Sequence, residues 1–335
     1  MTERLKFGLN LAGFDPALET AKLSKTAEEQ GFEHVWIADE NPSPLCRDVV
    51  VNVTTVAMKT SRIKIGTGIC NFYTRHPALL ATFVASVDEM APGRIILGVG
   101  PGGDMPLRPL GIKMWEKPLG TVREGIEVVN RLLSGETVDF EGEMIRAKGA
   151  KLSFLSKARI PIYLAARSPR FMQMIGEIAD GSLLNTPFHY MKKATSIIKE
   201  GTEKAGRSMR DLDIGNILPF AIEERTEMAQ EKVKRLATFM SAFTSDAVHD
   251  ELGTKPEKIR AIRENVGTGR IDKAASFMTS DMIDEFSVAG TPADCLERVE
   301  QFARSGVTQM IFVIPEGAEG IKSAGSRIIS AFKSR

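Results

Sequence analysis

Short apolar runs alternate with longer amphipathic stretches along the whole chain. Eight of these runs have the length and the Val/Ile/Leu content of buried strands, and the stretches between them carry apolar residues at helical spacing. The expected strands are residues 6–11, 34–38, 63–68, 95–99, 162–166, 182–185, 213–222 and 309–314. Continuous apolar strands that are separated by helices predict a parallel sheet with both faces covered.

Eight strand–helix units in 335 residues fit a closed barrel, so the expected fold is α/β, a (β/α)8 TIM barrel with helical insertions. A doubly wound open sheet has the same alternation and is the alternative. Segments 135–160 and 245–285 interrupt the alternation and are interpreted as insertions. Because no Pro/Gly/Ser-rich linker divides the chain, we expect one barrel domain over residues 1–335, with 245–285 as a helical insertion within it.

Helix-start signals support several of the expected helices. Asp15 and Pro16 are expected to begin the first helix, as a carboxylate N-cap and a first-turn proline. Thr121 and Glu124 have the spacing of a capping box, which predicts that the helix after the fourth strand begins there.

Charge and cysteine content exclude several classes of protein. The chain has 44 basic and 43 acidic residues, a net charge of +1, so no overall field would attract nucleic acid or an anionic membrane. No apolar run approaches the ~20 residues of a membrane span, and the chain starts without a signal-peptide pattern. Three widely spaced cysteines form neither a disulfide framework nor a metal-ligand spacing, so we expect a cytoplasmic protein without a metal site.

Polar residues at the strand ends are the candidates for catalysis, since active sites of such barrels lie at the C-terminal ends of the strands. Asn10 lies near the end of the first strand, Asp39 and Glu40 follow the second, and Asn185 is at the end of the sixth. Two adjacent carboxylates on one turn point in two directions. Asp39 is the better candidate of the pair, with a loop cap as its alternative role. No HExxH or GxSxG motif is present, and His34 lies in an apolar strand, where a core role is expected.

Glycines concentrate at the ends of the third and fourth strands. Gly66 and Gly68 indicate a bulge or a close approach by another group, or else tight packing in the barrel. Gly98, Gly100 and Gly102 surround the end of the fourth strand but lack the spacing of a dinucleotide fingerprint. Their backbone N–H groups could face a flat ring or an anion, and a plain strand-to-loop turn is the alternative.

Arg167 and Ser168 follow the fifth strand at the start of a helix. Unpaired N–H groups, the helix dipole and the guanidinium favour a phosphate at such a position, whereas a solvated surface cap is the alternative. Few candidate acid–base residues lie beside the glycine-lined strand ends, which favours a bound cofactor that carries the reactivity itself.

Residues 88–100 read DEMAPGRIILGVG: an acidic helix end, then Gly-Arg, then an apolar strand that ends in Gly-x-Gly. This stretch resembles the bacterial luciferase-like superfamily, and within it the chain looks most like the coenzyme F420-dependent methylenetetrahydromethanopterin reductases. Further stretches that fit the reductases in order are residues 7–8, 66–77, 98–118, 160–181, 286–292 and 306–309. The resemblance spans nearly the whole chain.

The resemblance implies a luciferase-like TIM barrel that binds coenzyme F420, an 8-hydroxy-5-deazaflavin, in its mouth. It implies hydride transfer to 5,10-methylenetetrahydromethanopterin or a related electrophilic carbon. It also implies a non-prolyl cis peptide at Gly68–Ile69 behind the ring, and a phosphate site over residues 165–169. The expected catalytic residues are Asp39 and Asn10, and the expected cofactor-binding residues are Gly68, Ile69, Cys70, Asn71, Gly98, Gly100, Gly102, Ala165, Ala166, Arg167, Ser168 and Asn185.

Two positions depart from the reductase pattern. The reductases carry a glutamate in a first-strand stretch that reads like GIEF, whereas this chain has GLNL, and the amide of Asn10 neither gives nor takes a proton at ordinary pH. Glu40 stands where many family members have histidine. The substrate therefore stays open, and so do two other functions: an FMN-dependent luciferase-like monooxygenase, with FMN as the cofactor, and a non-catalytic flavin-binding barrel.

The expected partners are a small-molecule substrate, a pterin or similar, and further copies of the chain in a homodimer or homotetramer. The resemblance implies this assembly, and apolar residues on the expected helices indicate it as well. Packing within the chain's own core is the alternative for these residues. They are Phe83, Val84, Met90, Met172 and Met174.

Overall fold

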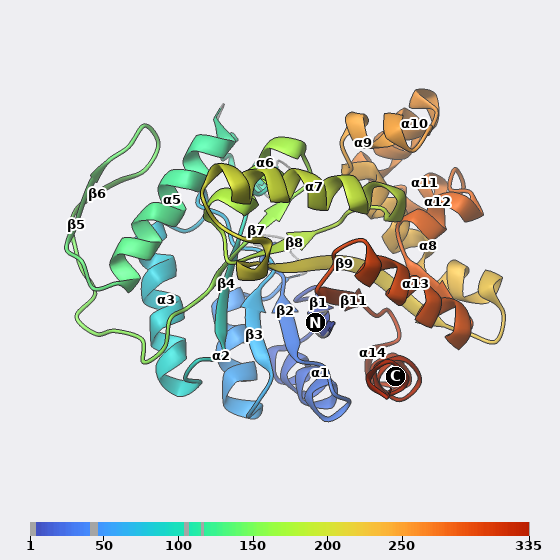
Figure 1. Cartoon of the computed structure of the whole chain (residues 1–335), viewed down its shortest axis with the longest axis horizontal. Helices are drawn as coiled ribbons and strands as arrows, with labels where there is room; N and C mark the ends of the chain where they lie inside the picture. Colours follow the sequence, from blue (N-terminus) through green and yellow to red (C-terminus); the bar gives the residue numbers. More distant parts are fainter. Residues whose placement is uncertain (1–4, 41–45, 104–106, 115–116, 335) are drawn as a thin grey trace.

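Eight parallel strands form a closed barrel in the computed structural model, which describes residues 5–40, 46–103, 107–114 and 117–334 (Figure 1). Neighbouring strands pair in chain order, and the last pairs with the first to close the sheet. All eight expected strands are confirmed, and the open-sheet alternative is excluded. The strands are β1 (Lys6–Leu11), β2 (His34–Ile37), β3 (Lys64–Thr67), β4 (Ile95–Val99), β7 (Ile162–Ala166), β8 (Gly181–Leu184), β9 (Asp213–Ile222) and β11 (Gln309–Val313).

Helices between the strands surround the barrel in Figure 1, as the parallel order requires. α1 begins at Ala17, and Pro16, with an extended ψ of 144°, is the boundary residue, so the predicted Asp15 cap is wrong. The helices of this outer layer are α1 (Ala17–Glu29), α2 (Val49–Lys59), α3 (Pro77–Met90), α5 (Pro118–Leu133), α6 (Pro169–Ile178), α7 (Phe188–Lys204), α8 (Thr226–Phe243), α13 (Pro292–Arg304), α14 (Gly317–Ala324) and α15 (Ser330–Lys333).

The start of α5 also differs from its sequence signal. Pro118, whose fixed φ suits a first helical turn, begins the helix, so Thr121 lies inside it. The predicted capping box is therefore wrong. Glu124 instead accepts hydrogen bonds from the backbone N–H groups of residues 143–145, at 2.9 to 3.0 Å.

Residues 143–145 belong to a hairpin that the apolar pattern does not predict. β5 (Val138–Glu141) and β6 (Arg146–Ala150) pair antiparallel at the left edge of Figure 1. The hairpin escapes prediction because most of its residues are exposed and neither strand carries an apolar run.

A group of helices follows α8 before the chain returns to the barrel. They are α9 (Asp246–Glu251), α10 (Pro256–Gly267), α11 (Ile271–Ala275) and α12 (Ser280–Glu285). β10 (Val288–Gly290), a strand too short to be predicted, then pairs with the end of β9. An apolar cluster that includes Val233, Ile262 and Phe286 holds α10 and α12 on α8, and α11 also packs against α8.

Large side chains fill the inside of the barrel. Trp36 on β2 is fully buried, packs with Tyr163 and Ile311, and donates its indole N–H to Gln309 at 3.1 Å. The His34 ring stacks on Trp36 at 6.1 Å, and burial lowers the pKa of His34 to about 4, which confirms its core role. Four partly buried residues, from the strand ends and from α8, pack on this cluster: Ile69, Ala165, Met240 and Val313.

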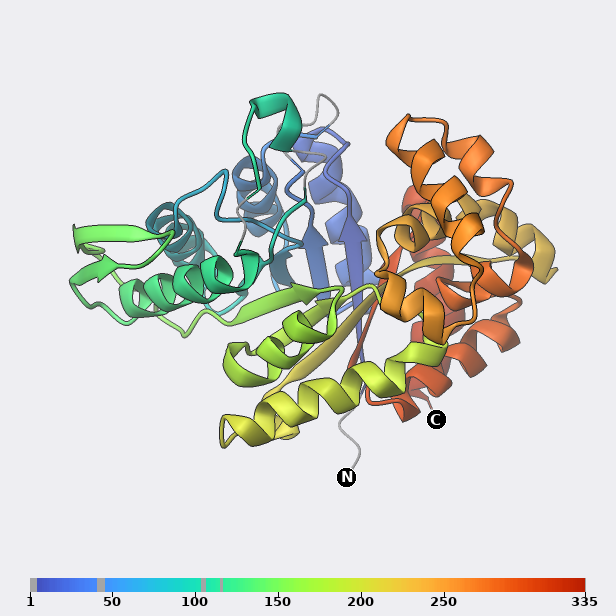
Figure 2. The same cartoon turned by 90° about the horizontal axis from the view of Figure 1, so that it is seen from above.

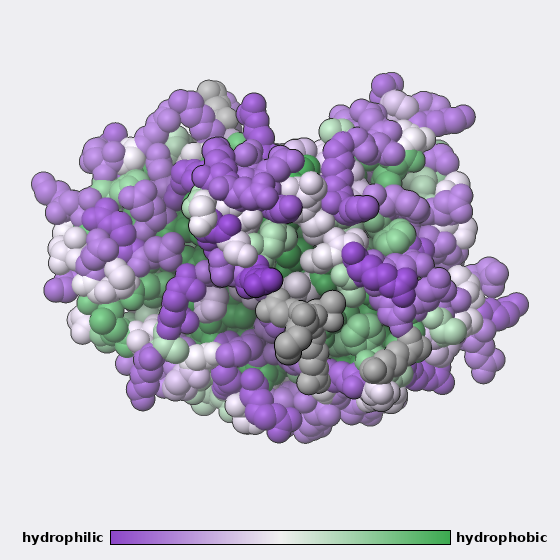
Figure 3. Space-filling view, viewed as in Figure 1, coloured by the Kyte–Doolittle hydropathy of each residue, from purple (hydrophilic) through white to green (hydrophobic). Residues whose placement is uncertain are grey.

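The C-terminal ends of the parallel strands all lie at one end of the barrel. In Figure 2, residues 107–111 and the helices α9 to α11 rise on two sides of that end. Figure 3 shows a mostly hydrophilic face on which apolar residues are visible only in patches. Within the described ranges, no helix is long and apolar enough to cross a membrane.

Candidate active site

Asn10 at the end of β1 and Gly68 after β3 lie against each other. A Cβ atom on Gly68 would be 3.2 Å from Asn10 Nδ2, so a larger residue would press on the amide. The peptide bond between Gly68 and Ile69 is cis, as the resemblance implies. The chain then rejoins the sheet, because the Cys70 N–H donates to the Gly98 carbonyl at 2.9 Å.

Two of the glycines at the end of β4 make room for neighbouring protein groups. A Cβ atom on Gly98 would be 1.9 Å from the Thr67 carbonyl oxygen, so packing alone requires glycine there. At Gly100 the added atom would be 3.1 Å from Ile69 and 3.2 Å from Ala165. Ile69, Gly100 and Ala165 therefore form a compact apolar wall at the strand ends.

Asn71 shapes the turn after β3. Its side-chain oxygen accepts hydrogen bonds from the N–H groups of Tyr73 and Thr74, both at 3.0 Å. Gly102, with a φ of +69°, brings the loop after β4 against this side chain: a Cβ atom there would be 3.3 Å from Asn71 Cβ. The loops that follow β3 and β4 are thus held together.

Asp39 is buried and has two partners. Its carboxylate lies 3.5 Å from Arg75 Nε and accepts a hydrogen bond from the Cys70 thiol. Burial raises the pKa of Asp39, and the charge of Arg75 opposes this shift. Burial also raises the pKa of Cys70 well above its usual value, so the thiol is an unreactive hydrogen-bond donor.

Glu40 follows Asp39 directly and is half-buried. Burial raises the pKa of Glu40, and the positive charge of Arg167, which follows β7, opposes this rise. Asp39 therefore has a close partner in Arg75, whereas Glu40 experiences the charge of Arg167.

Arg167 is exposed to water but held by its neighbours. Its Nη2 donates to Asn185 Oδ1 at 3.2 Å, and its guanidinium carbon lies 5.4 Å from the centre of the Phe243 ring. Asn185 is anchored in turn by a 3.2 Å hydrogen bond from its Nδ2 to the Ile217 carbonyl. Desolvation by the surrounding protein lowers the pKa of Arg167, and the negative charge of Glu40 opposes this shift.

The start of α6 lies next to this arginine. Ser168 is the N-cap residue, but no side chain caps the helix. Ala165 packs toward the barrel interior, whereas Ala166 lies in the layer between strands and helices. The first N–H groups of α6, together with its dipole, are suited to bind an anion.

Three residues near these candidates are not predicted as site residues. Arg75 lies within the stretch that resembles the reductases, but its pairing with Asp39 has no sequence signal. Met240 and Phe243 come from the end of α8, and only the tertiary fold brings them to the barrel mouth. No cluster of three or more His, Cys, Asp or Glu that could hold a metal occurs in the described ranges.

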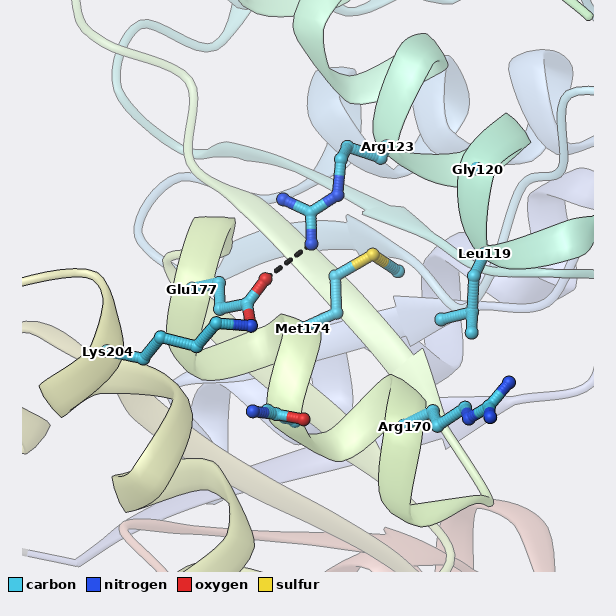
Figure 4. Close-up of a pocket in the computed structure, with 8 residues that line it drawn as sticks. Leu119, Gly120, Arg123, Arg170, Met174, Glu177 and Lys204 are labelled. Atoms are coloured by element: carbon cyan, nitrogen blue, oxygen red, sulfur yellow. Dashed lines mark hydrogen bonds and ion pairs between the residues drawn. The ribbon is translucent and has the colours of Figure 1, made fainter. Parts of the chain in front are cut away.

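A separate groove lies in the outer helical layer, between α5, α6 and α7 (Figure 4). It has a volume of about 280 Å³ and contains none of the predicted site residues. Arg170 lines it, two residues into α6, and Glu177 pairs there with Arg123 and Lys204. Arg167 and Arg170 therefore have different surroundings, although they are three residues apart.

The fold and the arrangement at the strand ends agree with one family. The model of the luciferase-like monooxygenase family matches residues 6–309, and the chain belongs to this family. Within the family it is similar to proteins named 5,10-methylenetetrahydromethanopterin reductase. The one from Methanolobus tindarius is 36% identical, over 97% of this chain and 100% of that protein, and the one from Methanopyrus kandleri is 33% identical, over 98% and 99%.

Solved structures give the same result. The coenzyme F420 dependent tetrahydromethanopterin reductase from Methanopyrus kandleri has a TM-score of 0.90 and 31% identity, over 98% of this chain and 99% of that one. An F420-dependent secondary alcohol dehydrogenase in complex with an F420-acetone adduct has a TM-score of 0.82, but its 18% identity supports likeness of fold alone. Both comparisons agree with the resemblance in the sequence.

Proposed function

We propose that the protein is an oxidoreductase that transfers hydride from reduced coenzyme F420 to the methylene carbon of 5,10-methylenetetrahydromethanopterin or a close relative of it. The observation that carries this proposal is the likeness to reductases of that name, at 36% identity over 97% of this chain and the whole of the relative. The TM-score of 0.90 to an F420 dependent reductase supports it further.

The barrel mouth suits a flat ring with an anionic tail. Ile69, Gly100 and Ala165 offer an apolar wall without long side chains. Arg167 and the uncapped start of α6 suit a phosphate. The coenzyme, when bound, supplies the hydride. The proposed contacts are the predicted cofactor-binding residues, among which Gly98 and Cys70 would support the wall from beneath, because their backbone groups are paired within the protein.

The chain's own residues would position the reactants and exclude water. Asn10 offers its amide as a hydrogen-bond donor and acceptor and moves no proton. Asp39 places a negative charge beneath the site, and Arg75 balances it.

A binding and turnover experiment tests this proposal. The purified protein is titrated with oxidised coenzyme, and the reduced coenzyme is then mixed with the methylene pterin while the visible absorbance of the oxidised form is recorded. We expect tight binding and substrate-dependent oxidation. Binding without oxidation would contradict the pterin assignment and favour a non-catalytic flavin-binding barrel or another acceptor. Relatives named F420-dependent glucose-6-phosphate dehydrogenase, at 27% identity, make a sugar phosphate the first alternative to test.

An FMN-dependent monooxygenase is the second candidate, because the matching family model carries the description luciferase-like monooxygenase. Competition between FMN and coenzyme F420 for the protein separates the two. Preference for FMN, with consumption of oxygen in the presence of a reductant, would support the monooxygenase.

We also propose a homodimer, through a surface that differs from the predicted one. Phe83, Val84, Met172 and Met174 are buried in the chain's own core, and only Met90 of that set is exposed. Val51 and Met58 on α2 and Leu79 on α3 are exposed as well, and α2 and α3 pack side by side. Light scattering on the wild type and on Met58→Glu tests this surface, with the exposed Leu155→Glu as control.

We also propose that the protein is cytoplasmic and that it forms a single domain. No disulfide joins Cys46, Cys70 and Cys295, which supports a cytoplasmic protein. The packing of α10, α11 and α12 on α8 supports a single barrel domain over residues 1–335, with 245–285 as an insertion. Limited proteolysis that released a stable fragment from this segment would argue for a separate domain.

A further inference from the structure

The last two turns of α8 bring aromatic side chains to the barrel mouth. Phe239 and Phe243 are four residues apart, so they lie on one face of the helix, and their ring centres are 4.7 Å apart at an interplanar angle of 54°. Met240, between them in the sequence, packs on the cluster that fills the barrel interior. The end of α8 therefore lies over the strand ends.

The two rings take no part in the core of the protein. The apolar core clusters of the described residues include neither Phe239 nor Phe243. Phe243 keeps 36% of its surface exposed, and Phe239 is half-buried. Aromatic side chains gain much free energy from burial, so two adjacent rings that the fold leaves accessible beside a candidate site favour contact with a ligand.

Arg167 connects the two rings to the proposed coenzyme site. Its guanidinium carbon lies over the Phe243 ring, 5.4 Å from the ring centre, within the range of a cation–π contact. The same guanidinium donates to Asn185 after β8 at 3.2 Å, and Arg167 itself directly precedes the uncapped start of α6. The rings thus border the proposed phosphate position on the side of α8.

The helical insertion holds the end of α8 in place. Arg263 on α10 donates to the carbonyl oxygens of Ala242 and Thr244, at 3.0 and 2.7 Å. His249 on α9 donates through Nε2 to the carbonyl oxygen of Ser241 at 2.9 Å. The last carbonyls of a helix lack i+4 partners, so bonds from outside the helix order its final turn. The two rings are therefore carried on backbone that is fixed before a ligand binds.

Resting on the proposed function, we propose that Phe239 and Phe243 form a platform on which a flat ring of the pterin substrate stacks. Phe243, the more exposed of the two, is then a specificity-determining residue of the site. The coenzyme ring already has a proposed place on the apolar wall of Ile69, Gly100 and Ala165. The rings of α8 are thus left for the second reactant, and a pterin offers them a flat pyrimidine ring.

The test measures binding of the methylene pterin to protein loaded with oxidised coenzyme, which has no hydride to transfer, so no turnover is needed. We expect Phe243→Ala to weaken pterin binding about tenfold or more. Phe243→Leu, which keeps apolar bulk without a flat ring, should weaken it about fivefold, and Phe243→Tyr should bind within about threefold of wild type. Affinity for the coenzyme should change by less than about threefold in all three variants.

Met228→Ala is the matched control, because Met228 is an exposed apolar residue on the same helix but lies in its first turn, away from Arg167. We expect wild-type affinity for both ligands in this variant. Thermal unfolding of each variant shows that it is folded at the temperature of the titration.

The outcomes separate this proposal from the proposed function. Equal pterin affinity of Phe243→Ala and wild type overturns the platform and leaves the proposed function intact. A loss of coenzyme affinity as large as the loss of pterin affinity also overturns it, because the rings would then serve the coenzyme. If the wild type binds the pterin but the pterin oxidises no reduced coenzyme, the proposed function fails, and the comparison of variants still decides the platform. A wild type that binds no pterin overturns the platform as well.

Discussion

The indole of Trp36 lies directly over the backbone of Gly66 inside the barrel. A Cβ atom on Gly66 would be 2.2 Å from Trp36 Cζ3, a separation that no real side chain could tolerate. The glycine that the sequence presents as a bulge or a close-approach signal therefore makes room for the chain's own tryptophan. This packing closes the barrel interior on the inner side of the strand ends, so a ligand has to bind at the mouth.

Gly66→Ala should destabilise the protein by about 3 kcal/mol, because overpacking forces Trp36 or β3 to move. The matched control is Gly120→Ala on α5, where nothing lies within 4 Å of the added atom. For Gly120→Ala we expect the free energy of unfolding to rise by up to about 1 kcal/mol, because alanine has a higher helix propensity than glycine. Chemical denaturation of the three proteins measures the difference. Equal stability of Gly66→Ala and wild type would show that Trp36 has space that the structure does not contain.

Glu28 on α1 should make stability depend on pH on the acidic side. Burial alone would raise the pKa of Glu28, but hydrogen bonds from Lys25 and from the N–H groups of residues 61–63 outweigh burial and hold it well below the usual value. A carboxylate with a lowered folded-state pKa stabilises the fold above its unfolded pKa, and this contribution is lost as pH falls.

Glu28→Gln should therefore lose about 3 kcal/mol near neutral pH and less at about pH 3, where the wild type has begun to lose the same contribution. Unfolding free energies at several pH values measure this convergence. The exposed neighbour Glu29→Gln serves as control, and a constant gap between Glu28→Gln and wild type at all pH values would contradict the assignment.

The strands were predictable because a buried parallel strand needs an unbroken apolar run, and all eight runs fold as expected. The starts of the helices were harder to predict. Thr121 and Glu124 have the capping-box spacing, yet α5 begins at Pro118, and Glu124 instead accepts hydrogen bonds from the hairpin. Local signals compete with one another, and the pattern alone does not say which prevails.

The candidate site was also predictable only in part. Its strand-end residues could be predicted once the fold was known, since parallel strands bring their C-terminal ends to one edge. The ion pair of Asp39 with Arg75, by contrast, joins two residues that lie far apart in the sequence. Phe243 reaches Arg167 only because α8 ends at the barrel mouth. Such long-range pairs have no local sequence signal.

Glu124→Gln should loosen the β5–β6 hairpin. Burial tends to raise the pKa of Glu124, but its three backbone hydrogen bonds outweigh burial and lower it, so the side chain acts as a carboxylate. The variant should lose amide-exchange protection at residues 143–145, about tenfold for a weakening of about 1.4 kcal/mol, with little change in the barrel strands. Hydrogen exchange read by mass spectrometry or NMR tests this. Glu127→Gln, exposed on the same helix, is the control. Equal amide-exchange protection of residues 143–145 in both variants would show that Glu124 does not hold the hairpin.

Arg75→Met should leave Asp39 buried without its counter-charge. Burial already raises the pKa of Asp39, and loss of the opposing cation should raise it further. A carboxyl with a raised folded-state pKa costs stability as pH rises from its unfolded pKa toward its folded one, so the variant's deficit should grow from about pH 4 to pH 7 and reach about 3 kcal/mol. Adding Asp39→Asn should recover part of it, because the neutral amide needs no cation. Unfolding measurements on both single variants and the double variant form a cycle that isolates the pair. Arg260→Met, exposed on α10, is the control, and additive effects in the cycle would mean that Arg75 supports the fold through Asp48 instead.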